Sequence, residues 1–381
     1  MKSPSDHAVV RRWLAEPLPA DVTLAIDRLA QTEDVRHIAV MPDVHLSEEV
    51  CTGTVVATGH RLLPHAVGSD IGCGMAAVCF AAPADLLDDE RAAARLLAGL
   101  YRVVPTMRHP RATLRDRLPA VLDDAPLSHP SLDKLKQRDG RVQFATLGRG
   151  NHFLEFQADT EGLLWLMVHS GSRALGQAIT VQHLGQAESA DTGVRFLDAD
   201  SPAGLAYLHD MEWACAYADQ SRQAMIEAVA ALMLELFGVA ADTASLIRCN
   251  HNHVRRETHL GTALWVHRKG AVSAQQGEAG IIPGSMGTLS FHVEGRGCNE
   301  ALCSSSHGAG RLLSRTEARQ TVSVRDLERE MKGVWFDHRL AERLRDEAPR
   351  AYKDVRAVMR AQRDLTRIVR ELRPILSYKG A

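Results

Sequence analysis

Short apolar segments, separated by polar turns rich in glycine, run through most of the chain. Residues 35–41, 54–58 and 75–81 predict strands, because aliphatic and β-branched residues recur in them and turn residues bound them. Residues 163–169 form a continuous apolar run, which indicates a strand buried on both faces. The pattern therefore predicts several short strands, with alternating segments adding two more at 262–272 and 288–295.

Other segments have helical spacing. Leucine and alanine recur at helical intervals over 83–100, with acidic residues in the first turns. Residues 205–237 predict one long helix or two, ended at Gly238, because glycine readily adopts the left-handed conformation that ends helices. Residues 324–369 predict mostly helical structure, and the proline-interrupted stretch 108–138 predicts short helical pieces on the surface.

The order of these elements favours a mixed fold. Strands and helices do not alternate as they do in a doubly wound sheet, and no stretch has the composition of a linker. The polar loops with candidate chemistry extend from Asp43 to Lys379, so a shared site would draw on the whole length. We therefore expect one α+β domain over residues 1–381, with mixed, irregular β-sheets surrounded by helices.

Composition narrows the classes of protein. The chain has 381 residues, 45% of them hydrophobic and 24% charged, which is ordinary for a soluble domain. No apolar run approaches the ~18 residues of a membrane helix. The first residues lack the apolar core of a secretory signal, so we expect a cytoplasmic protein without a membrane partner. The seven cysteines contain no CxxC pair, which argues against a disulfide framework and against a ribbon-type zinc site.

The charge balance leaves the partner open. A net charge of −2 does not indicate a polyanion partner, although nucleic-acid binding needs only a local basic surface. Residues 108–117 and 311–325 are arginine-rich strips of that kind, and arginine suits bidentate phosphate contacts. Each strip taken singly is also what an ordinary solvated surface looks like.

Five polar clusters adjoin apolar strands, and together they indicate a metal site. Asp70 and Cys73 stand three residues apart around a glycine, so both can point at one ion. Carboxylate, thiolate and imidazole ligands suit Mn²⁺, Zn²⁺ or Fe²⁺. Each cluster has an ordinary structural explanation by itself, and only the repetition favours a site. The clusters are Met41–His45, Ser69–Gly74, Gly150–Glu155, His169–Arg173 and Asn250–His253, and the histidines expected as ligands are His152, His169 and His251.

Two further histidines and one motif are set aside. His253 and His259 lie near His251 but lack the loop context. The string from Asn250 to His253 resembles an HNH nuclease motif by its letters alone, which is a weak match.

A second constellation indicates phosphate chemistry. His307 stands in a loop of small residues, 305–311, which lets a ligand approach the backbone closely. Shortly before it, the glycine loop 282–290 is a candidate anion-binding turn, although it does not fit the P-loop motif. An imidazole nitrogen that attacks phosphorus gives a labile phosphoramidate, which suits a transient nucleotidyl carrier. The alternative for the His307 loop is an ordinary turn with a surface histidine, and the alternative for the 282–290 loop is a tight turn.

Taken in order, these segments resemble the RtcB family of RNA-splicing ligases over nearly the whole chain. The matching motifs are Met41-Pro42-Asp43-Val44-His45, Asp70-Ile71-Gly72-Cys73-Gly74-Met75, Gly150-Asn151-His152-Phe153-Leu154-Glu155, His169-Ser170-Gly171-Ser172-Arg173, His251-Asn252, His267-Arg268-Lys269-Gly270-Ala271, Pro283-Gly284-Ser285-Met286-Gly287, His307-Gly308-Ala309-Gly310-Arg311, Ala351-Tyr352-Lys353-Asp354 and Lys379-Gly380.

The resemblance implies an RtcB-like fold and an unusual ligation. Such an enzyme joins RNA ending in a 2′,3′-cyclic phosphate or 3′-phosphate to RNA with a 5′-hydroxyl, using GTP and Mn²⁺. His307 would take GMP from GTP and pass it to the RNA 3′-phosphate, giving RNA(3′)pp(5′)G, from which the 5′-hydroxyl would displace it. The partners implied are RNA ends, with DNA 3′-phosphate ends as an alternative, and an archease-type activator.

The resemblance also assigns residues. By motif position Asp70, Cys73 and His152 would hold one manganese ion, and Cys73, His169 and His251 the other, with the thiolate bridging. The nucleotide would be contacted by Asn151, His152, Phe153, Leu154, Glu155, His251, Asn252, Pro283, Gly284, Ser285, Met286, Ser290, His307, Gly308, Ala309, Gly310 and Lys379.

One motif departs from the family. Where the family continues with a glycine-rich stretch, Leu46-Ser47-Glu48-Glu49-Val50 follows His45, and the next glycine is Gly53. These two carboxylates put the substrate in doubt more than the guanylylation step. The alternatives are a divergent paralogue that caps 3′-phosphate ends without sealing them, a metal-dependent cyclic phosphodiesterase that needs no GTP, and a non-catalytic protein that binds RNA ends.

Overall fold

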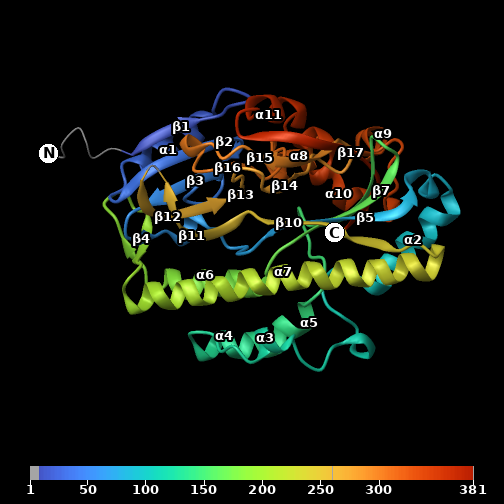
Figure 1. The fold of residues 1–381 in the computed structure, drawn as a ribbon, viewed down its shortest axis with the longest axis horizontal. Coiled ribbons are helices and arrows are strands. Elements are labelled where there is room, and N and C mark those ends of the chain that lie inside the picture. Colours follow the sequence, from blue (N-terminus) through green and yellow to red (C-terminus); the bar gives the residue numbers. More distant parts are fainter. Residues whose placement is uncertain (1–7, 260, 381) are drawn as a thin grey trace.

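Two large β-sheets form the frame of the protein in a computed structural model that describes residues 8–259 and 261–380 (Figure 1). In the five-stranded sheet, of order β1-β2-β3-β12-β11, only the first pair is parallel. The seven-stranded sheet, of order β10-β5-β7-β6-β17-β15-β14, is antiparallel throughout. The strands are β1 (Val9–Arg12), β2 (Val35–His45), β3 (Thr52–Thr58), β5 (Gly74–Pro83), β6 (Phe153–Asp159), β7 (Leu163–Ser170), β10 (Ala241–Asn250), β11 (Asn252–His259), β12 (Thr262–Lys269), β14 (Ala279–Ile282), β15 (Ser290–Gly295) and β17 (Thr366–Lys379).

Two small sheets complete the described strands. One pairs β13 (Ala271–Ser273) with β16 (Ser304–Ser306), and the other has the order β4-β9-β8, formed by Arg61–Leu62, Arg195–Asp198 and Glu188–Ser189. The first of these small sheets matters for the site, because β16 leads directly into the His307 loop.

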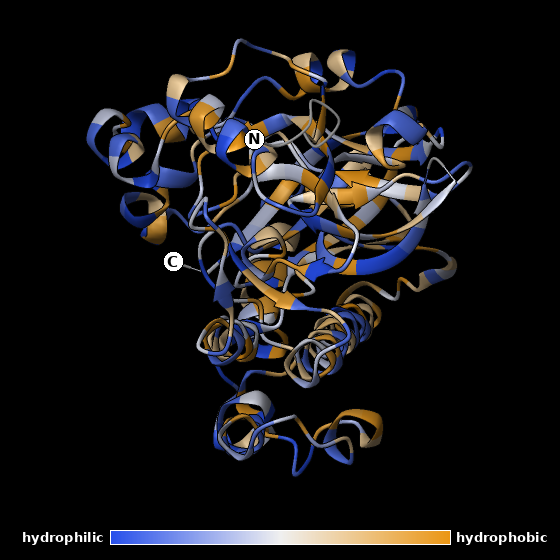
Figure 2. Ribbon diagram, turned by 90° about the vertical axis from the view of Figure 1, so that its left-hand side faces the viewer, coloured by the Kyte–Doolittle hydropathy of each residue, from blue (hydrophilic) through white to orange (hydrophobic). Residues whose placement is uncertain are grey.

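Helix α7 (Pro202–Phe237) runs beneath the sheets, with α6 (Arg173–Leu184) and α2 (Glu90–Val103) packed along it (Figure 1). Ser201 caps its start by accepting a hydrogen bond from the Gly204 N–H, and Gly238 ends it with a φ of +68°. Figure 2 looks along α7, and each helix there carries both hydrophobic and hydrophilic residues. The others are α1 (Ala20–Ala30), α3 (Ala120–Asp123), α4 (Pro130–Leu135), α5 (Arg141–Gln143), α8 (Arg315–Thr321), α9 (Val324–Glu330), α10 (Ala341–Leu344) and α11 (Val355–Ala361). The short helices α3, α4 and α5 lie below α7 (Figure 1).

The largest hydrophobic core lies between the seven-stranded sheet and the α2–α6–α7 layer. Phe80 of β5 and Phe156 of β6 meet there with ring centroids 6.0 Å apart, and Tyr207 and Tyr217 of α7 are fully buried. Burial of such side chains is the main favourable contribution to folding, at about 25 cal/mol per Å² of apolar area. Within the described residues, no helix combines the length and the apolar character needed to cross a bilayer.

The expected α+β class is confirmed, and so are the strands at 35–41, 54–58, 75–81 and 163–169. Residues 205–237 form one helix, which ends at Gly238 as expected. The surface pieces of 108–138 appear as the short helices α3 and α4 and the 3₁₀ turn Arg111–Thr113.

Other boundaries were wrong. Residues 83–100 divide into the 3₁₀ turn Ala84–Leu87 and α2, and 262–272 breaks into two strands at Gly270, whose φ is +61°. The strand expected at 288–295 begins at Ser290. The helical prediction for 324–369 overran into β17, whose first half is charged and partly exposed. β17 is a strand because it pairs with β15 and β6, which are distant in sequence. The spacing of residues within β17 cannot reveal such pairing.

Candidate active site

One edge of the seven-stranded sheet gathers the expected metal ligands. Cys73 directly precedes β5, His169 lies near the end of β7, and His152 directly precedes β6. His251 is the single residue between β10 and β11. Because β10, β5, β7 and β6 are neighbours, with Gly74 opposite both Asn250 and Ser170, antiparallel pairing brings all of these positions to the same edge.

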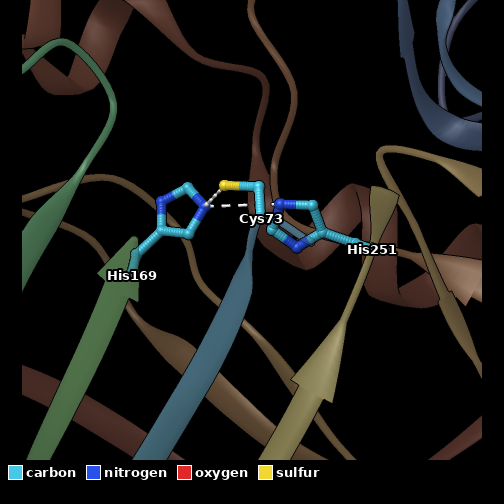
Figure 3. Close-up of side chains that lie close together, drawn as sticks. All are labelled: Cys73, His169 and His251. Carbon is cyan, nitrogen blue, oxygen red and sulfur yellow. Dashed lines mark hydrogen bonds between the residues drawn. The ribbon is translucent and has the colours of Figure 1, made fainter. Parts of the chain in front are cut away.

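The ligand atoms form two groups that share one sulfur atom. Cys73 Sγ lies 3.3 Å from His169 Nε2, which lies 3.4 Å from His251 Nε2 (Figure 3). The same sulfur lies 3.5 Å from His152 Nε2, and that nitrogen lies 2.9 Å from Asp70 Oδ2. The structure therefore brings together all five of the expected ligands, in the two overlapping sets that the resemblance implies.

The arrangement fits bound cations. His169 Nδ1 donates to the Asn151 carbonyl oxygen at 3.0 Å, so its Nε2 carries the lone pair that faces the sulfur. Asp70 Oδ1 and His251 Nδ1 are buried and have no hydrogen-bond partner in the described part of the chain. Burial lowers the pKa of His169 and of His251 well below the usual range, which keeps both rings neutral and able to bind a metal.

Arg222 of α7 ties the ligand-bearing segments together from below. Its side chain is fully buried. Its Nη1 donates to the carbonyl oxygens of Gly72, at 2.9 Å, and of Ser170, at 2.7 Å. Its Nη2 donates to Asn250 Oδ1 at 2.5 Å. Each of these partners is the chain neighbour of an expected metal ligand, so one guanidinium fixes the spacing of Cys73, His169 and His251.

His307 is held by a buried aspartate. Asp43 Oδ2 accepts hydrogen bonds from His307 Nδ1, at 2.7 Å, and from the His307 backbone N–H, at 3.1 Å. Asp43 is fully buried near the end of β2, and Lys353 holds this part of the strand by donating to the carbonyl oxygens of Pro42 and Val44. Gly310, with a φ of +75°, packs so closely on the Asp43 backbone that a Cβ would clash there.

The histidine and the ligand groups share one space. The His307 and His251 rings lie 4.8 Å apart, centroid to centroid, and both line a cavity of about 870 Å³. Most of the expected nucleotide contacts line the same cavity: Asn151, Phe153, Glu155, His251, Asn252, Pro283, Gly284, Ser285, Met286, Ser290, His307, Gly308, Ala309, Gly310 and Lys379.

Two expected nucleotide contacts lie elsewhere. Leu154 points to the opposite face of β6 from Phe153 and Glu155 and is part of the main hydrophobic core, so its side chain does not reach the cavity. His152 does not line the cavity and belongs to the ligand group of Asp70 and Cys73.

Internal hydrogen bonds organise part of the glycine loop at Pro283–Met286. The Ser285 N–H donates to Thr288 Oγ1 at 2.7 Å, and the Gly284 N–H donates to Ser290 Oγ at 3.3 Å. These two N–H groups are therefore engaged within the protein, and anion binding by this loop stays a prediction. The loop also adjoins the His307 loop, since the Ala309 N–H donates to the Pro283 carbonyl oxygen at 3.0 Å.

A buried carboxylate and a buried ammonium also line the cavity. Glu155 is 2% exposed, and burial raises its pKa to about 8. Lys379 Nζ lies 2.6 Å from Glu347 Oε2 and stands over the Phe153 ring at 5.6 Å. Burial would raise the pKa of Glu347, but Lys379 and Arg315 outweigh it and lower the pKa to about 2. These groups offer both hydrogen-bond acceptors and a positive charge to a polar heterocycle.

Sequence reasoning did not single out three residues that organise the site. Asp43 stands in one of the five polar clusters but was given no role of its own, and nothing local in the sequence connects it with His307. Arg222 lies in the middle of a long helix, and Glu347 lies 32 residues from Lys379. No local pattern marks either of them, since both act through contacts made by the fold.

Comparison with known proteins now adds a family. The sequence profile described as tRNA-splicing ligase RtcB matches residues 25–125 and 120–380. The chain belongs to the RtcB ligase family. An RtcB relative, the RNA-splicing ligase RtcB of Escherichia coli K12, is 37% identical over 405 residues, covering 99% of this chain and 98% of the relative. RNA-splicing ligase RtcB1 from another Escherichia coli strain is 38% identical with the same coverage.

More distant RtcB proteins also align over most of their length. The RNA-splicing ligase RtcB2 of Escherichia coli is 30% identical over 94% of this chain and 93% of the relative. The tRNA-splicing ligase RtcB of Methanococcus maripaludis is 27% identical over 96% of this chain and 93% of the relative. The family resemblance drawn from the motifs is thus confirmed for the chain as a whole.

Proposed function

We propose that this protein is a GTP- and Mn²⁺-dependent RNA ligase that joins 3′-phosphate or 2′,3′-cyclic phosphate ends to 5′-hydroxyl ends. One observation carries the proposal: a histidine held by a buried aspartate lies in the same cavity as a sulfur-centred set of metal ligands. A phosphoryl-transfer nucleophile needs both an oriented lone pair and neutralisation of phosphate charge, and this arrangement supplies residues for each.

In the first step His307 acts as the nucleophile. Because Asp43 accepts the proton on Nδ1, the lone pair is on Nε2, which attacks the α-phosphorus of GTP. A P–N bond forms as the bond to pyrophosphate breaks, giving His307–GMP. The carboxylate of Asp43 stabilises the positive charge that the ring acquires, as the aspartate of a catalytic triad does.

In the later steps His307 is the leaving group. An oxygen of the RNA 3′-phosphate attacks the GMP phosphorus and breaks the P–N bond, which gives RNA(3′)pp(5′)G. The 5′-hydroxyl of the second strand then attacks the RNA phosphate, forming the new phosphodiester and releasing GMP. A cyclic phosphate is hydrolysed to the 3′-phosphate beforehand.

Asp70, Cys73 and His152 would hold one manganese ion, and Cys73, His169 and His251 the other. Bound Mn²⁺ supplies positive charge that offsets the phosphates and lowers the pKa of hydroxyl groups. Asn252 connects the Asp70 loop with the turn at Gly270. Its Nδ2 donates to the Asp70 carbonyl oxygen at 3.0 Å, and its Oδ1 accepts from the Gly270 N–H at 2.9 Å.

We assign guanine to the end of the cavity with Glu155 and Lys379. The Glu155 carboxyl group, when ionised, is an acceptor for a ring N–H and an amino group on one edge of the base, and the Lys379 ammonium is a donor to a carbonyl oxygen. Phe153, beside Lys379, offers an aromatic face.

The test is a covalent adduct. Incubation with labelled GTP and Mn²⁺ should give an acid-labile protein–GMP species that His307→Ala abolishes. His338→Ala, which changes a histidine side chain that is 61% exposed, is the matched control and should retain the adduct. Absence of an adduct on the wild-type protein would overturn the proposal.

A further inference from the structure

One face of strand β6 carries three side chains in a row, and the third is a buried amide that is only partly satisfied. Strand alternation places Phe153, Glu155 and Gln157 on this face. Phe153 and Glu155 line the cavity, whereas Gln157 is fully buried and does not line it. Gln157 Oε1 has no hydrogen-bond partner among residues 8–259 and 261–380. Burying an unpartnered amide oxygen costs free energy, so we expect the amide to serve another group.

The group that Gln157 serves is Glu155. Gln157 Nε2 donates to Glu155 Oε1 at 2.7 Å, and its contact with Met167 Sδ, at 3.9 Å, is much weaker. A glutamate side chain has several rotatable bonds, and a hydrogen bond to one oxygen removes most of that freedom. Gln157 therefore fixes the orientation of the carboxyl group from the side away from the cavity.

The neighbouring strand supports the same carboxyl group. Ser377 of β17 lies opposite Glu155 in the ladder, and its buried Oγ has no hydrogen-bond partner of its own in the described part of the chain. Burial raises the pKa of Glu155 to about 8, and the hydrogen bond from Gln157 and the charge of Lys379 oppose this rise. The surroundings of Glu155 thus favour the carboxylate, which is the form that accepts hydrogen bonds from a base.

We propose that Gln157 is a positioning residue for base recognition, which holds Glu155 so that its carboxylate meets the ring N–H and the 2-amino group of guanine. This inference rests on the proposed ligase function, in which Glu155 contacts guanine, and deepens it. Gln157 then sets the preference for GTP over ITP, because ITP keeps the triphosphate and the ring N–H but lacks the 2-amino group. Since Gln157 does not line the cavity, it acts only through Glu155.

Guanylylation of the full chain with GTP and with ITP measures this preference. The efficiency of adduct formation on His307 is determined with each labelled nucleotide, and the GTP-to-ITP ratio is compared among variants, so that a general change in activity cancels. Gln157→Met keeps the size of the side chain but removes the donor. Its ratio should fall roughly tenfold through a higher half-saturating concentration of GTP, while the maximal rate stays within about twofold.

Two further variants separate positioning from a merely structural role. In a Glu155→Ala background the ratio should already be low, and Gln157→Met should lower it no further, because the two residues act as one unit. Gln157→Asn keeps an amide but is one methylene too short to reach Glu155 Oε1. Its ratio should fall as in Gln157→Met, and this variant carries the test if Gln157→Met does not fold.

Gln362→Met is the matched control. Gln362 is equally buried, and its Nε2 likewise lies beside a methionine sulfur, 3.3 Å from Met359 Sδ, but its Oε1 accepts from the Ser306 N–H and it makes no contact with Glu155. Its GTP-to-ITP ratio should remain at the wild-type value.

Three results overturn the inference: an unchanged ratio in Gln157→Met, an equal fall in Gln362→Met, or a further fall when Gln157→Met is added to Glu155→Ala. A wild type that uses GTP and ITP equally well overturns it too. The adduct itself keeps the two ideas apart. If the wild type forms His307–GMP and one of these results is found, only the role of Gln157 is refuted, whereas no adduct with either nucleotide refutes the proposed function.

Discussion

The metal side and the nucleotide side of the cavity share one sheet but differ in how their side chains are held. On the metal side, Cys73, His169 and His251 lie on neighbouring strand ends, and the antiparallel ladder itself brings them together. On the nucleotide side, Glu155 and Lys379 also lie on paired strands, β6 and β17, but His307 comes from a loop, and Asp43 and Glu347 hold the His307 and Lys379 side chains. Strand pairing places short side chains directly, whereas long side chains need buried charged partners to hold one conformation.

Each half has a buried charged residue that links its parts. Arg222 donates to two carbonyl oxygens and one amide beside the metal ligands. Glu347 accepts from Lys379, Arg315 and Tyr352 beside the proposed guanine site. Arg222 joins the segments beside the expected metal ligands, and Glu347 joins side chains beside the proposed guanine site. Loss of Arg222 should therefore weaken metal binding, and loss of Glu347 should weaken nucleotide binding. This contrast organises the predictions below.

The largest effect is expected at Asp43. Asp43→Asn keeps the size of the side chain but removes the charge that supports His307, so formation of the GMP adduct should slow by about 10²- to 10⁴-fold. Mn²⁺ binding should persist, because Asp43 touches none of the ligand groups. Single-turnover labelling measures the rate, with the exposed Asp242→Asn as control; a wild-type rate in Asp43→Asn contradicts the assigned role.

Arg222→Met should damage the metal half. Loss of the guanidinium leaves the carbonyl oxygens of Gly72 and Ser170 without their donor, and Mn²⁺ affinity should fall by about 10- to 100-fold. The free energy of unfolding should fall by about 3 kcal/mol, because buried polar groups lose a charged partner. Calorimetric titration with Mn²⁺ and a melting curve measure both.

The matched control for Arg222→Met is Arg248→Met. Arg248 pairs with Asp219, as Arg222 also does, but its side chain is 47% exposed and donates to Asp219, not to Gly72, Ser170 or Asn250. Equal losses of Mn²⁺ affinity in the two variants would show that Arg222 does not position the ligands.

Glu347→Gln should weaken the nucleotide half alone. Without its charge, Lys379 and Arg315 lose a shared partner, and the KM for GTP should rise by roughly tenfold while Mn²⁺ affinity stays unchanged. Asp346→Asn is the control, since Asp346 pairs with Arg315 and Arg319 but not with Lys379. A parallel loss of Mn²⁺ affinity in Glu347→Gln would contradict the separation of the two halves.

The smallest effect is a pH dependence of stability at Glu155. Burial raises its pKa to about 8 from a usual value of 4.5, so the folded state binds a proton that the unfolded state releases between these values. Stability is therefore lost as the pH rises through this window. Glu155→Gln removes that loss, and its melting temperature relative to wild type should increase from pH 5 to pH 8.

The melting curves are recorded with a chelator present, so that metal binding does not enter the comparison. Glu161→Gln, at an exposed position in the following turn, should show no such trend. A difference between Glu155→Gln and wild type that stays constant with pH rules out ionisation of Glu155 as the cause.

Sequence patterns predicted the candidate metal ligands well, but they predicted only part of the secondary structure. Asp70, Cys73, His152, His169 and His251 were chosen as ligands because small-residue loops beside apolar strands repeat with polar residues in them, and all five converge. Leu154 was included only because the motif contains it, and strand alternation turned it into the core. The strand β17 was missed, because its charged first half reads as a helix until its partners are known.

The sequence by itself determined which residue types stand at strand ends and loops, and from them the family and the set of candidate ligands. Only the tertiary structure decided that Asp43 supports His307 and that Arg222 anchors the ligand segments. The reason is physical. Local spacing and backbone preferences act over a few residues, whereas buried charges are partnered across hundreds of residues, and only burial makes such pairs specific.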